Sequence, residues 1–137
     1  MGIDPIFLSS IGAIGKSDFE LALLVEGGFP LASIDALQKQ GFTSAEISDV
    51  IISARTLKHR KTCNARLSSA ESERALRIAQ IVALADRVFD SHEKAMRWLR
   101  TATIRLENRT ALQMLTSEAG GRVVENMLGQ IDHGFFA

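Results

Sequence analysis

The strongest candidates for covalent or metal chemistry in this chain are its three histidines, its single cysteine and Ser91. His59, His92 and His133 lie in separate segments without metal-ligand spacing, and Cys63 is the single cysteine. Residues 91–94 (Ser-His-Glu-Lys) match the S-x-x-K pattern of a serine nucleophile, but the partner motifs of that chemistry are missing and the serine suits a helix N-cap. We therefore predict a chain that is not an enzyme and has no catalytic residue, bound metal or cofactor.

Clustered positive charge points to another kind of chemistry, the binding of phosphate groups. The chain is neutral as a whole, but residues 55–77 contain seven basic and two acidic side chains, a net charge of +5, whereas residues 1–54 have a net charge of −5. No acidic residue lies between Arg55 and Arg66. Such a block is typical of a surface that faces a polyanion, although a solvated helix face is the commoner reason for one.

Two short predicted helices position this basic block. Thr43-Ser44-Ala45-Glu46 is a capping box that opens the first helix. After a tight turn, a second helix covers residues 54–61, basic outside and anchored inside by Leu57. The pair is typical of a helix-turn-helix unit, whose second helix enters the major groove of DNA, but spacing and charge alone leave DNA binding and an ordinary helix pair equally open. The predicted DNA-binding residues are Ser53, Arg55, Thr56, Lys58, His59, Arg60 and Lys61.

Apolar periodicity and capping signals predict further helices in the rest of the chain. The predicted segments are residues 18–26, residues 30–40, a long helix from the capping box at residues 68–71 to about residue 89, one capped by Ser91, one at residues 112–115 and a last one from about Ser117. The long helix is apolar on most sides and is therefore expected to be buried on most sides. Gly120 and Gly121 would weaken the last helix, so we expect a neighbouring helix to approach there closely. Residues 1–16 have no period and are predicted to form a loosely ordered arm.

The predicted fold class is all-α, with a helix-turn-helix half followed by a small helical half and joined to it by the long buried helix. The expected boundaries are an N-terminal arm at residues 1–16, a first domain at residues 17–77 and a second at residues 78–137. Two prolines and no tyrosine argue against a strand-rich fold. No apolar run approaches the roughly 20 residues that span a bilayer, the start lacks the basic lead-in of a signal peptide, and a single cysteine suits a reducing cytosol. We therefore expect a cytoplasmic protein with no membrane partner.

Two features near the C-terminus could contact a partner protein. Trp98 has helical spacing with neighbouring apolar residues, which is more typical of a core position than of a partner contact. The aromatic pair Phe135-Phe136 follows Gly134 and has little chain left to cover it. These rings either fold back onto the last helix or dock into a partner, where aromatic residues anchor interfaces, and the sequence leaves both open. A segment that docks would suggest a protein that acts by plugging a partner.

From about residue 17 to residue 137, these motifs resemble the Xre/MbcA/ParS family of bacterial type II antitoxins, which pair with toxins of the RES-domain family. The residues that match in the helix-turn-helix half are Arg55-Thr56-Leu57, His59-Arg60-Lys61, Leu67-Ser68, Glu71-Ser72 and Arg74. Those that match in the second half are Ala85, Val88-Phe89, Ala95, Arg97-Trp98-Leu99, Leu106, Leu112, Leu115-Thr116, Gly120, Val124, Leu128, Ile131, His133-Gly134 and Ala137. The chain departs from the family pattern in loops and caps, at Asp90, Thr103, Asn108-Arg109 and Ala111.

The resemblance implies two functions. The first half would bind operator DNA, generally as a homodimer, and repress its own toxin–antitoxin operon. The second half would bind the cognate RES-domain toxin, an enzyme that consumes NAD or transfers ADP-ribose from it, and would place its C-terminal segment at the mouth of the toxin's active site. The toxin-binding residues implied are Arg97, Trp98, Ile131, His133, Gly134, Phe135, Phe136 and Ala137. The alternative is a helix-turn-helix regulator with a dimerisation or ligand-sensing C-terminal half and no toxin partner.

Overall fold

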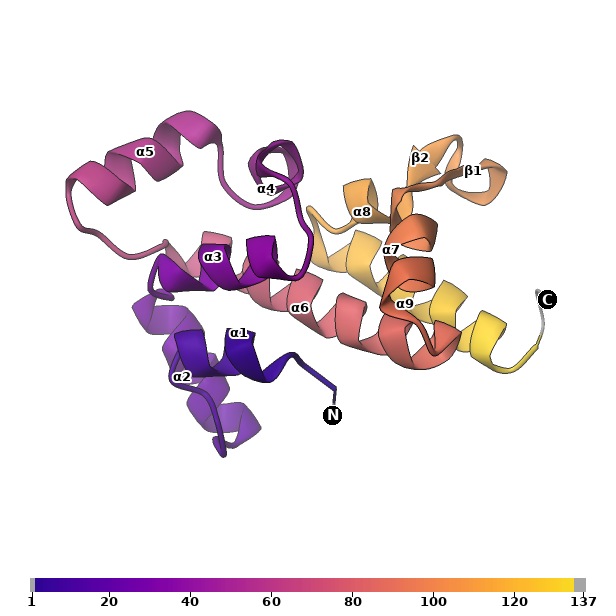
Figure 1. Cartoon of the computed structure of the whole chain (residues 1–137), viewed down its shortest axis with the longest axis horizontal. Helices are drawn as coiled ribbons and strands as arrows, with labels where there is room; N and C mark the ends of the chain where they lie inside the picture. The colour runs from indigo at the N-terminus through magenta and orange to yellow at the C-terminus, as the bar shows by residue number, and fades with distance from the viewer. Residues whose placement is uncertain (1, 135–137) are drawn as a thin grey trace. The chain divides into compact units, whose positions relative to one another are not determined.

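The structure, a computed structural model, describes residues 2–134 of the chain (Figure 1). These residues form nine α-helices, one short 3-10 helix and a two-stranded antiparallel sheet, which confirms the predicted all-α class. They divide into two compact units, Asp4–Leu76 and a second unit that begins at Arg77 and also includes Gly2 and Ile3. Among the described residues, no helix combines the length and the apolar content needed to cross a bilayer.

The first unit contains five helices and the start of a sixth. The five are α1 (Pro5–Ser10), α2 (Asp18–Gly27), α3 (Ala32–Lys39), α4 (Ser44–Val50) and α5 (Ala54–Thr62), and α6 (Ser69–Phe89) continues into the second unit. Helix α1 packs against α3. The largest fully buried side chains of this unit are Phe7, Phe29, Ile34, Leu37 and Ile51.

The sequence predicts a loosely ordered stretch over residues 1–16, but part of it is the helix α1. The Asp4 carboxylate accepts a hydrogen bond from the Phe7 N–H at 3.3 Å, and Pro5 occupies the first helical turn, where its missing N–H costs nothing. Phe7 is fully buried and packs edge-to-face against Phe29, with ring centroids 6.1 Å apart. A helix of six residues is too short to show an apolar period in the sequence. Its order depends instead on the burial of the Phe7 ring.

Local capping chemistry sets the ends of the other helices in this unit. Both bonds of the predicted capping box between Thr43 and Glu46 are present, at 2.9 and 3.1 Å. Helix α2 is followed by its C-cap residue Gly28, whose φ of +86° is left-handed. A Cβ at Gly28 would lie 2.1 Å from the carbonyl oxygen of Leu67. Only glycine fits there without a shift of the backbone.

The second unit combines the rest of α6 with shorter elements. They are α7 (His92–Arg100), strand β1 (Ala102–Thr103), the 3-10 helix η1 (Ile104–Leu106), strand β2 (Arg109–Thr110), α8 (Ala111–Met114) and α9 (Glu118–Asp132). Between residues 77 and 89 only Gln80 and Arg87 are exposed, as expected for a helix that is apolar on most sides. The fully buried side chains here include Val82, Leu99, Leu115, Val124 and Leu128.

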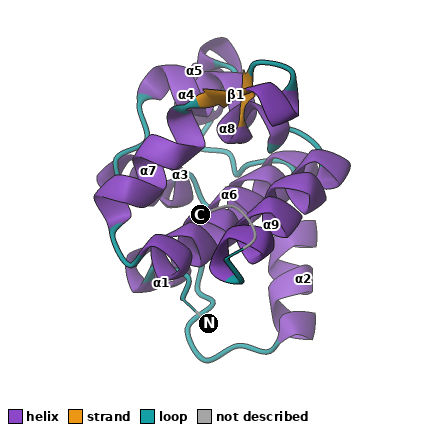
Figure 2. Ribbon diagram, turned by 90° about the vertical axis from the view of Figure 1, so that its right-hand side faces the viewer, coloured by secondary structure: helices purple, strands orange, loops and turns teal. Residues whose placement is uncertain are grey.

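Two features of this unit come from short elements. The sequence predicts only helices, but the second unit also contains two short strands (Figure 2). Strands β1 and β2 pair in antiparallel fashion, with Ala102 opposite Thr110. Strands of two residues are too short to show the alternation by which strands are recognised. Near the start of α9, a Cβ at Gly120 would lie 1.9 Å from the Met114 carbonyl oxygen of α8. The close approach expected at Gly120 is therefore confirmed.

Candidate functional sites

Helices α4 and α5 are joined by a tight turn and form the helix-turn-helix pair. At the start of α5, the Ser53 hydroxyl accepts a hydrogen bond from the Thr56 N–H at 3.2 Å and donates one to the Thr56 hydroxyl at 2.8 Å. The Ala54 N–H donates to the Ser48 hydroxyl of α4 at 3.3 Å. Two of the predicted DNA-binding residues, Ser53 and Thr56, thus also fix the first turn of α5.

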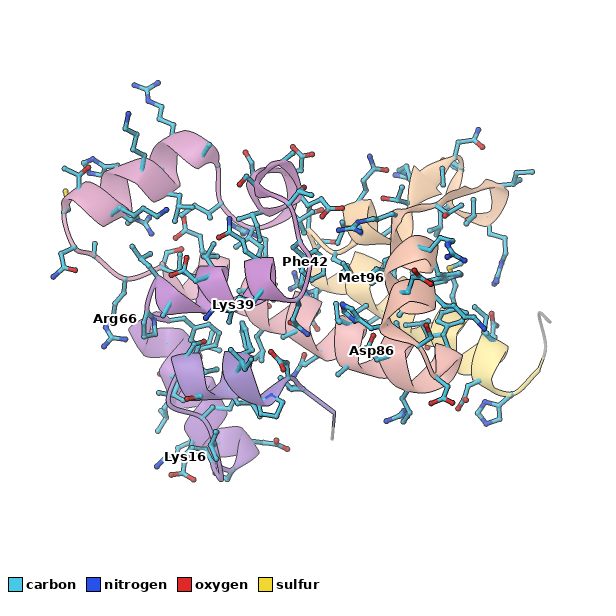
Figure 3. All side chains as sticks on the ribbon, in the orientation of Figure 1. Lys16, Lys39, Phe42, Arg66, Asp86 and Met96 are labelled. Atoms are coloured by element: carbon cyan, nitrogen blue, oxygen red, sulfur yellow. The ribbon has the colours of Figure 1, made fainter. Side chains whose placement is uncertain are left out.

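Exposure divides the predicted DNA-binding residues of α5 between two faces. The exposed ones are Arg55, Lys58, His59 and Lys61, and the half-buried ones are Thr56 and Arg60. Positions 55, 58 and 59 share one side because residues three and four apart are neighbours on a helix. Nitrogen-tipped side chains extend from α5 into solvent (Figure 3). This face can reach phosphates or base edges of a nucleic acid.

The predicted apolar anchor of α5 holds the helix only in part. Leu57 is half-buried, and no residue of α5 is fully buried. A groove of about 250 Å³ lies between α4 and α5, and its lining includes Ile47, Ile52 and Leu57. Because the apolar contact is incomplete, polar contacts must contribute to the position of α5.

Arg60 supplies the main polar contact between α5 and α6. Its guanidinium pairs with the Glu71 carboxylate, with Nη2 3.3 Å from Oε2, and Nη1 also donates to the Arg66 carbonyl at 3.2 Å. The side chains of Arg60 and Glu71 are 23% and 11% exposed. The sequence groups Arg60 with the DNA contacts, whereas the structure directs its guanidinium to partners within the protein.

Glu71 connects this ion pair to the first turn of α6. Its carboxylate accepts a hydrogen bond from the Ser68 N–H at 2.7 Å, and its own N–H donates to the Ser68 hydroxyl at 3.1 Å, which confirms the predicted capping box. Burial by itself raises the pKa of Glu71, but the hydrogen bonds from the Ser68 N–H and from Arg60 outweigh burial and hold that pKa below its ordinary value. The charged carboxylate therefore serves both helices at once.

Two more arginines of the basic block bind backbone carbonyls. Arg74 donates from Nε and Nη2 to the Ile51 carbonyl at 3.0 and 2.7 Å, which ties the turn before α5 to α6. Arg66 donates to the Gly28 carbonyl at 3.2 Å. Sequence reasoning misses these positioning roles because the partners lie 23 and 38 positions away in the chain. No local pattern identifies a carbonyl at that separation.

In the second unit, the predicted partner contacts Arg97 and Trp98 lie on α7. Trp98 is half-buried, and its ring packs on Phe89 with centroids 5.8 Å apart and planes tilted by 41°. Arg97 is 68% exposed, and its guanidinium lies 3.6 Å from the Glu93 carboxylate one turn earlier. Trp98 is therefore part of the apolar packing of this unit while remaining partly accessible, and Arg97 lies on the surface.

The other predicted contacts follow the last turn of α9. Ile131 is half-buried, and His133 and Gly134 are exposed. The Nδ1 of His133, as an N–H, donates to the Gly129 carbonyl at 2.7 Å. Gly134 has a φ of +81°, the left-handed conformation that ends many helices. The remaining predicted contacts Phe135, Phe136 and Ala137 lie outside the described residues.

The serine and the histidine of the S-x-x-K match each have a structural role in this unit. Ser91 is the N-cap of α7, as predicted, and its hydroxyl accepts a hydrogen bond from the Lys94 N–H at 3.2 Å. The His92 Nδ1 lies 2.9 Å from the Asp86 carboxylate. Within residues 2–134, no group of three or more His, Cys, Asp or Glu side chains is arranged to hold a metal ion.

Two family models match the chain. The helix-turn-helix domain of Xre-like antitoxins matches residues 20–80, a range that contains α5 and the polar contacts that hold it. The C-terminal toxin-binding domain of Xre/MbcA/ParS antitoxins matches residues 84–134, a range that contains α7, the two strands and α9.

Three curated relatives, each named Antitoxin Xre, are similar to this chain over most of its length. The protein of Pseudomonas putida is 39% identical over 119 residues, which are 87% of this chain and 75% of the relative. That of Yersinia enterocolitica is 29% identical over 116 residues, or 82% of this chain and 78% of the relative. That of Photorhabdus laumondii is 26% identical over 128 residues, or 91% and 86%.

Proposed function

Because this chain belongs to the Xre/MbcA/ParS family of type II antitoxins, we propose that it neutralises a RES-domain toxin and represses the operon that encodes both proteins. One observation carries the proposal: a single chain combines a match to the toxin-binding domain with a helix-turn-helix unit whose second helix is cationic. Both activities consist of binding, so we propose a bacterial cytoplasmic protein that acts without catalysis. A gene for a RES-domain protein is expected beside its own.

In the proposed repressor function, α5 enters the major groove of operator DNA. The residues proposed to contact the DNA are Ser53, Arg55, Thr56, Lys58, His59 and Lys61. Arg60 remains paired with Glu71 and keeps α5 in position. Because each neutralised phosphate releases counterions, affinity for the operator should fall steeply as the salt concentration rises.

In the proposed antitoxin function, the segment that follows α9 blocks the active site of the toxin. The toxin consumes NAD or transfers ADP-ribose from it, and the segment from Ile131 to Ala137 would exclude NAD from its cleft. Arg97 and Trp98 would contact the toxin beside that cleft. Support comes from the match to the toxin-binding domain, which extends to residue 134, and from the exposure of His133 and Gly134.

Removal of residues 132–137 tests this mechanism. Among residues 2–134, the buried apolar side chains all lie before residue 129, so the shortened chain should still fold. NAD consumption by the toxin from the neighbouring gene should nevertheless return, both in co-expressing cells and with purified proteins. A chain whose positions 132–137 are all serine controls for length and should also release the toxin. Full inhibition by the shortened chain would reject the blocking mechanism.

We also propose that the chain binds its operator as a homodimer. Helix α2 has no buried residue, and Phe19 and Leu23, one turn apart, are 72% and 47% exposed. Contiguous exposed apolar surface of this kind marks interaction sites, and helix-turn-helix dimers place two recognition helices on two half-sites of a palindromic operator. The molar mass in solution tests the proposal, and a monomer at the concentrations that bind the operator would reject it.

A further inference from the structure

Ile104 is the most exposed of the large apolar side chains among residues 2–134, at 89%. It begins η1, between the two strands. A single exposed apolar residue is ordinary on a protein surface. Three features distinguish Ile104 from such a residue: its backbone is held by hydrogen bonds, its loop lies beside the end of α9, and the net charge of the surrounding residues is positive.

The backbone around Ile104 is tightly constrained. The Asn108 N–H donates to the Thr103 carbonyl at 2.8 Å, and the Glu107 N–H donates to the Ile104 carbonyl at 2.9 Å. Leu106, two residues after Ile104, is buried at 4% exposure. Glu107 and Asn108 have left-handed φ values of 56° and 67°, which cost free energy in residues other than glycine and persist only where the surroundings impose them. Ile104 is therefore presented by a preformed loop.

This loop lies beside the last turn of α9 within the second unit. The Arg105 Nη2 donates to the Gln130 Oε1 at 2.9 Å, which brings the residue after Ile104 into contact with the residue before Ile131. The segment proposed to block the toxin leaves α9 at that same turn. A partner that covers the end of α9 is therefore within reach of the loop as well.

The charge around the loop is positive. Residues 97–109 include four arginines and one acid, Glu107. The arginines are Arg97, Arg100, Arg105 and Arg109, and all four are exposed. Arginine is enriched among residues that dominate binding energy, where apolar anchors are surrounded by polar groups. The surface complementary to this loop is an apolar pocket with carboxylates at its rim.

We propose that Ile104 is an anchor for the toxin that is separate from the blocking segment, and that it inserts into an apolar pocket rimmed by acidic side chains. This inference rests on the proposed toxin binding and divides it between two parts of the surface. The loop around Ile104 supplies affinity, and the segment after α9 supplies inhibition. Since the loop is already ordered, little conformational entropy is lost when it binds.

Titration of the full-length chain into the purified toxin from the neighbouring gene tests the division. Burial of one isoleucine corresponds to about a 10- to 100-fold change in affinity, so Ile104→Ala should raise Kd by that factor and Ile104→Asp by more. Ile14→Asp is the matched control, because Ile14 is 61% exposed in the first unit, and it should leave Kd unchanged. The chain that lacks residues 132–137 should still bind the toxin while failing to inhibit it.

The outcomes separate this inference from the function on which it rests. Unfolding temperatures of the Ile104 variants should equal that of the wild type, since the side chain is exposed, so weaker binding cannot be attributed to unfolding. If the wild type binds the toxin and Ile104→Asp binds within twofold of it, the anchor is rejected while the antitoxin function stands. If the wild type does not bind, both are rejected.

Discussion

Replacement of Glu71 by glutamine isolates the contact that holds α5 against α6. The substitution preserves the shape of the side chain and leaves an amide oxygen for the Ser68 N–H, but it removes the charge that pairs with Arg60. A hydrogen bond to a charged group contributes about 1.5–3 kcal/mol to stability. Since the two side chains are 23% and 11% exposed, partial solvent screening favours the lower part of that range, a loss of about 1.5–2 kcal/mol.

The same substitution should weaken operator binding. Helix α5 has no fully buried residue, so loss of the ion pair allows it to move away from the position that fits the DNA. A tenfold loss of affinity corresponds to about 1.4 kcal/mol, close to the stability that the pair provides. Simple electrostatics predicts the opposite change, because removal of a negative charge near the DNA should raise affinity for a polyanion. The sign of the change therefore separates positioning from charge.

Operator affinity is measured by fluorescence anisotropy, and stability is measured by urea denaturation of the free protein. Glu26→Gln is the matched control, since it makes the same chemical change at an exposed position of α2, and it should alter stability by less than about 0.5 kcal/mol. Operator binding by Glu71→Gln that equals or exceeds that of the wild type would refute the positioning role of Arg60 and Glu71.

Acid titration provides a second measurement on the same pair. The pKa of Glu71 in the folded protein lies below its value in the unfolded chain, which is about 4.3 for glutamate. Its contribution to stability is therefore complete above about pH 4.3 and is lost as the pH falls through the lower, folded pKa. As the pH falls from about 4.3 through the folded pKa, the wild type should lose more stability than Glu71→Gln. Plots of unfolding free energy against pH for the two proteins should therefore approach each other at the lowest pH. Parallel curves would contradict the pKa shift.

Three further variants test other parts of the molecule. Changing Lys58 and Lys61 together to alanine should reduce the salt dependence of operator binding by a slope of about 2 without loss of stability, because both side chains are exposed; an unchanged slope in mobility-shift titrations argues against phosphate contacts by α5. Phe19→Asp should convert the proposed dimer into a monomer in light scattering, and a persistent dimer would exclude α2 from the interface. Thr103→Val should raise the free energy of unfolding by about 1 kcal/mol, because the Thr103 Oγ1 is buried with no hydrogen-bond partner among the described residues; a lower urea midpoint would mean that the hydroxyl is satisfied in solution.

The helices that the sequence predicts correctly are those whose signals are local. The capping boxes at Thr43 and Ser68 involve side chains three residues apart, and the structure contains both hydrogen bonds of each box. Helix α1 and the β1–β2 pair are missed because each is too short to show a period. The order of α1 depends on a buried side chain far away in the chain, as the packing of Phe7 on Phe29 illustrates.

The candidate DNA-binding site was predictable in composition but not in geometry. Charge and spacing identify α5 as the basic helix, and the structure places it after a tight turn, as expected. Which of its cations face solvent depends on the location of Glu71, which lies 11 positions after Arg60. The sequence presents Glu71 only as a cap of its own helix, so its second role becomes apparent only in three dimensions.

The different chemistry of arginine and lysine gives a reason to expect fewer phosphate contacts than a count of positive charges suggests. A guanidinium can donate several hydrogen bonds in a fixed plane, which suits carbonyls and carboxylates, whereas an ammonium is a strongly hydrated point charge. Within the basic block at residues 55–77, the arginines that bind groups within the protein are Arg60, Arg66, Arg74 and Arg77, and the cations left exposed on α5 are Arg55, Lys58 and Lys61. Phosphate contacts by all seven would give a salt slope of about −6 per chain, and contacts by three would give about −3. A slope near −3 is therefore expected, and one near −6 would mean that the internal arginine contacts open when the DNA binds.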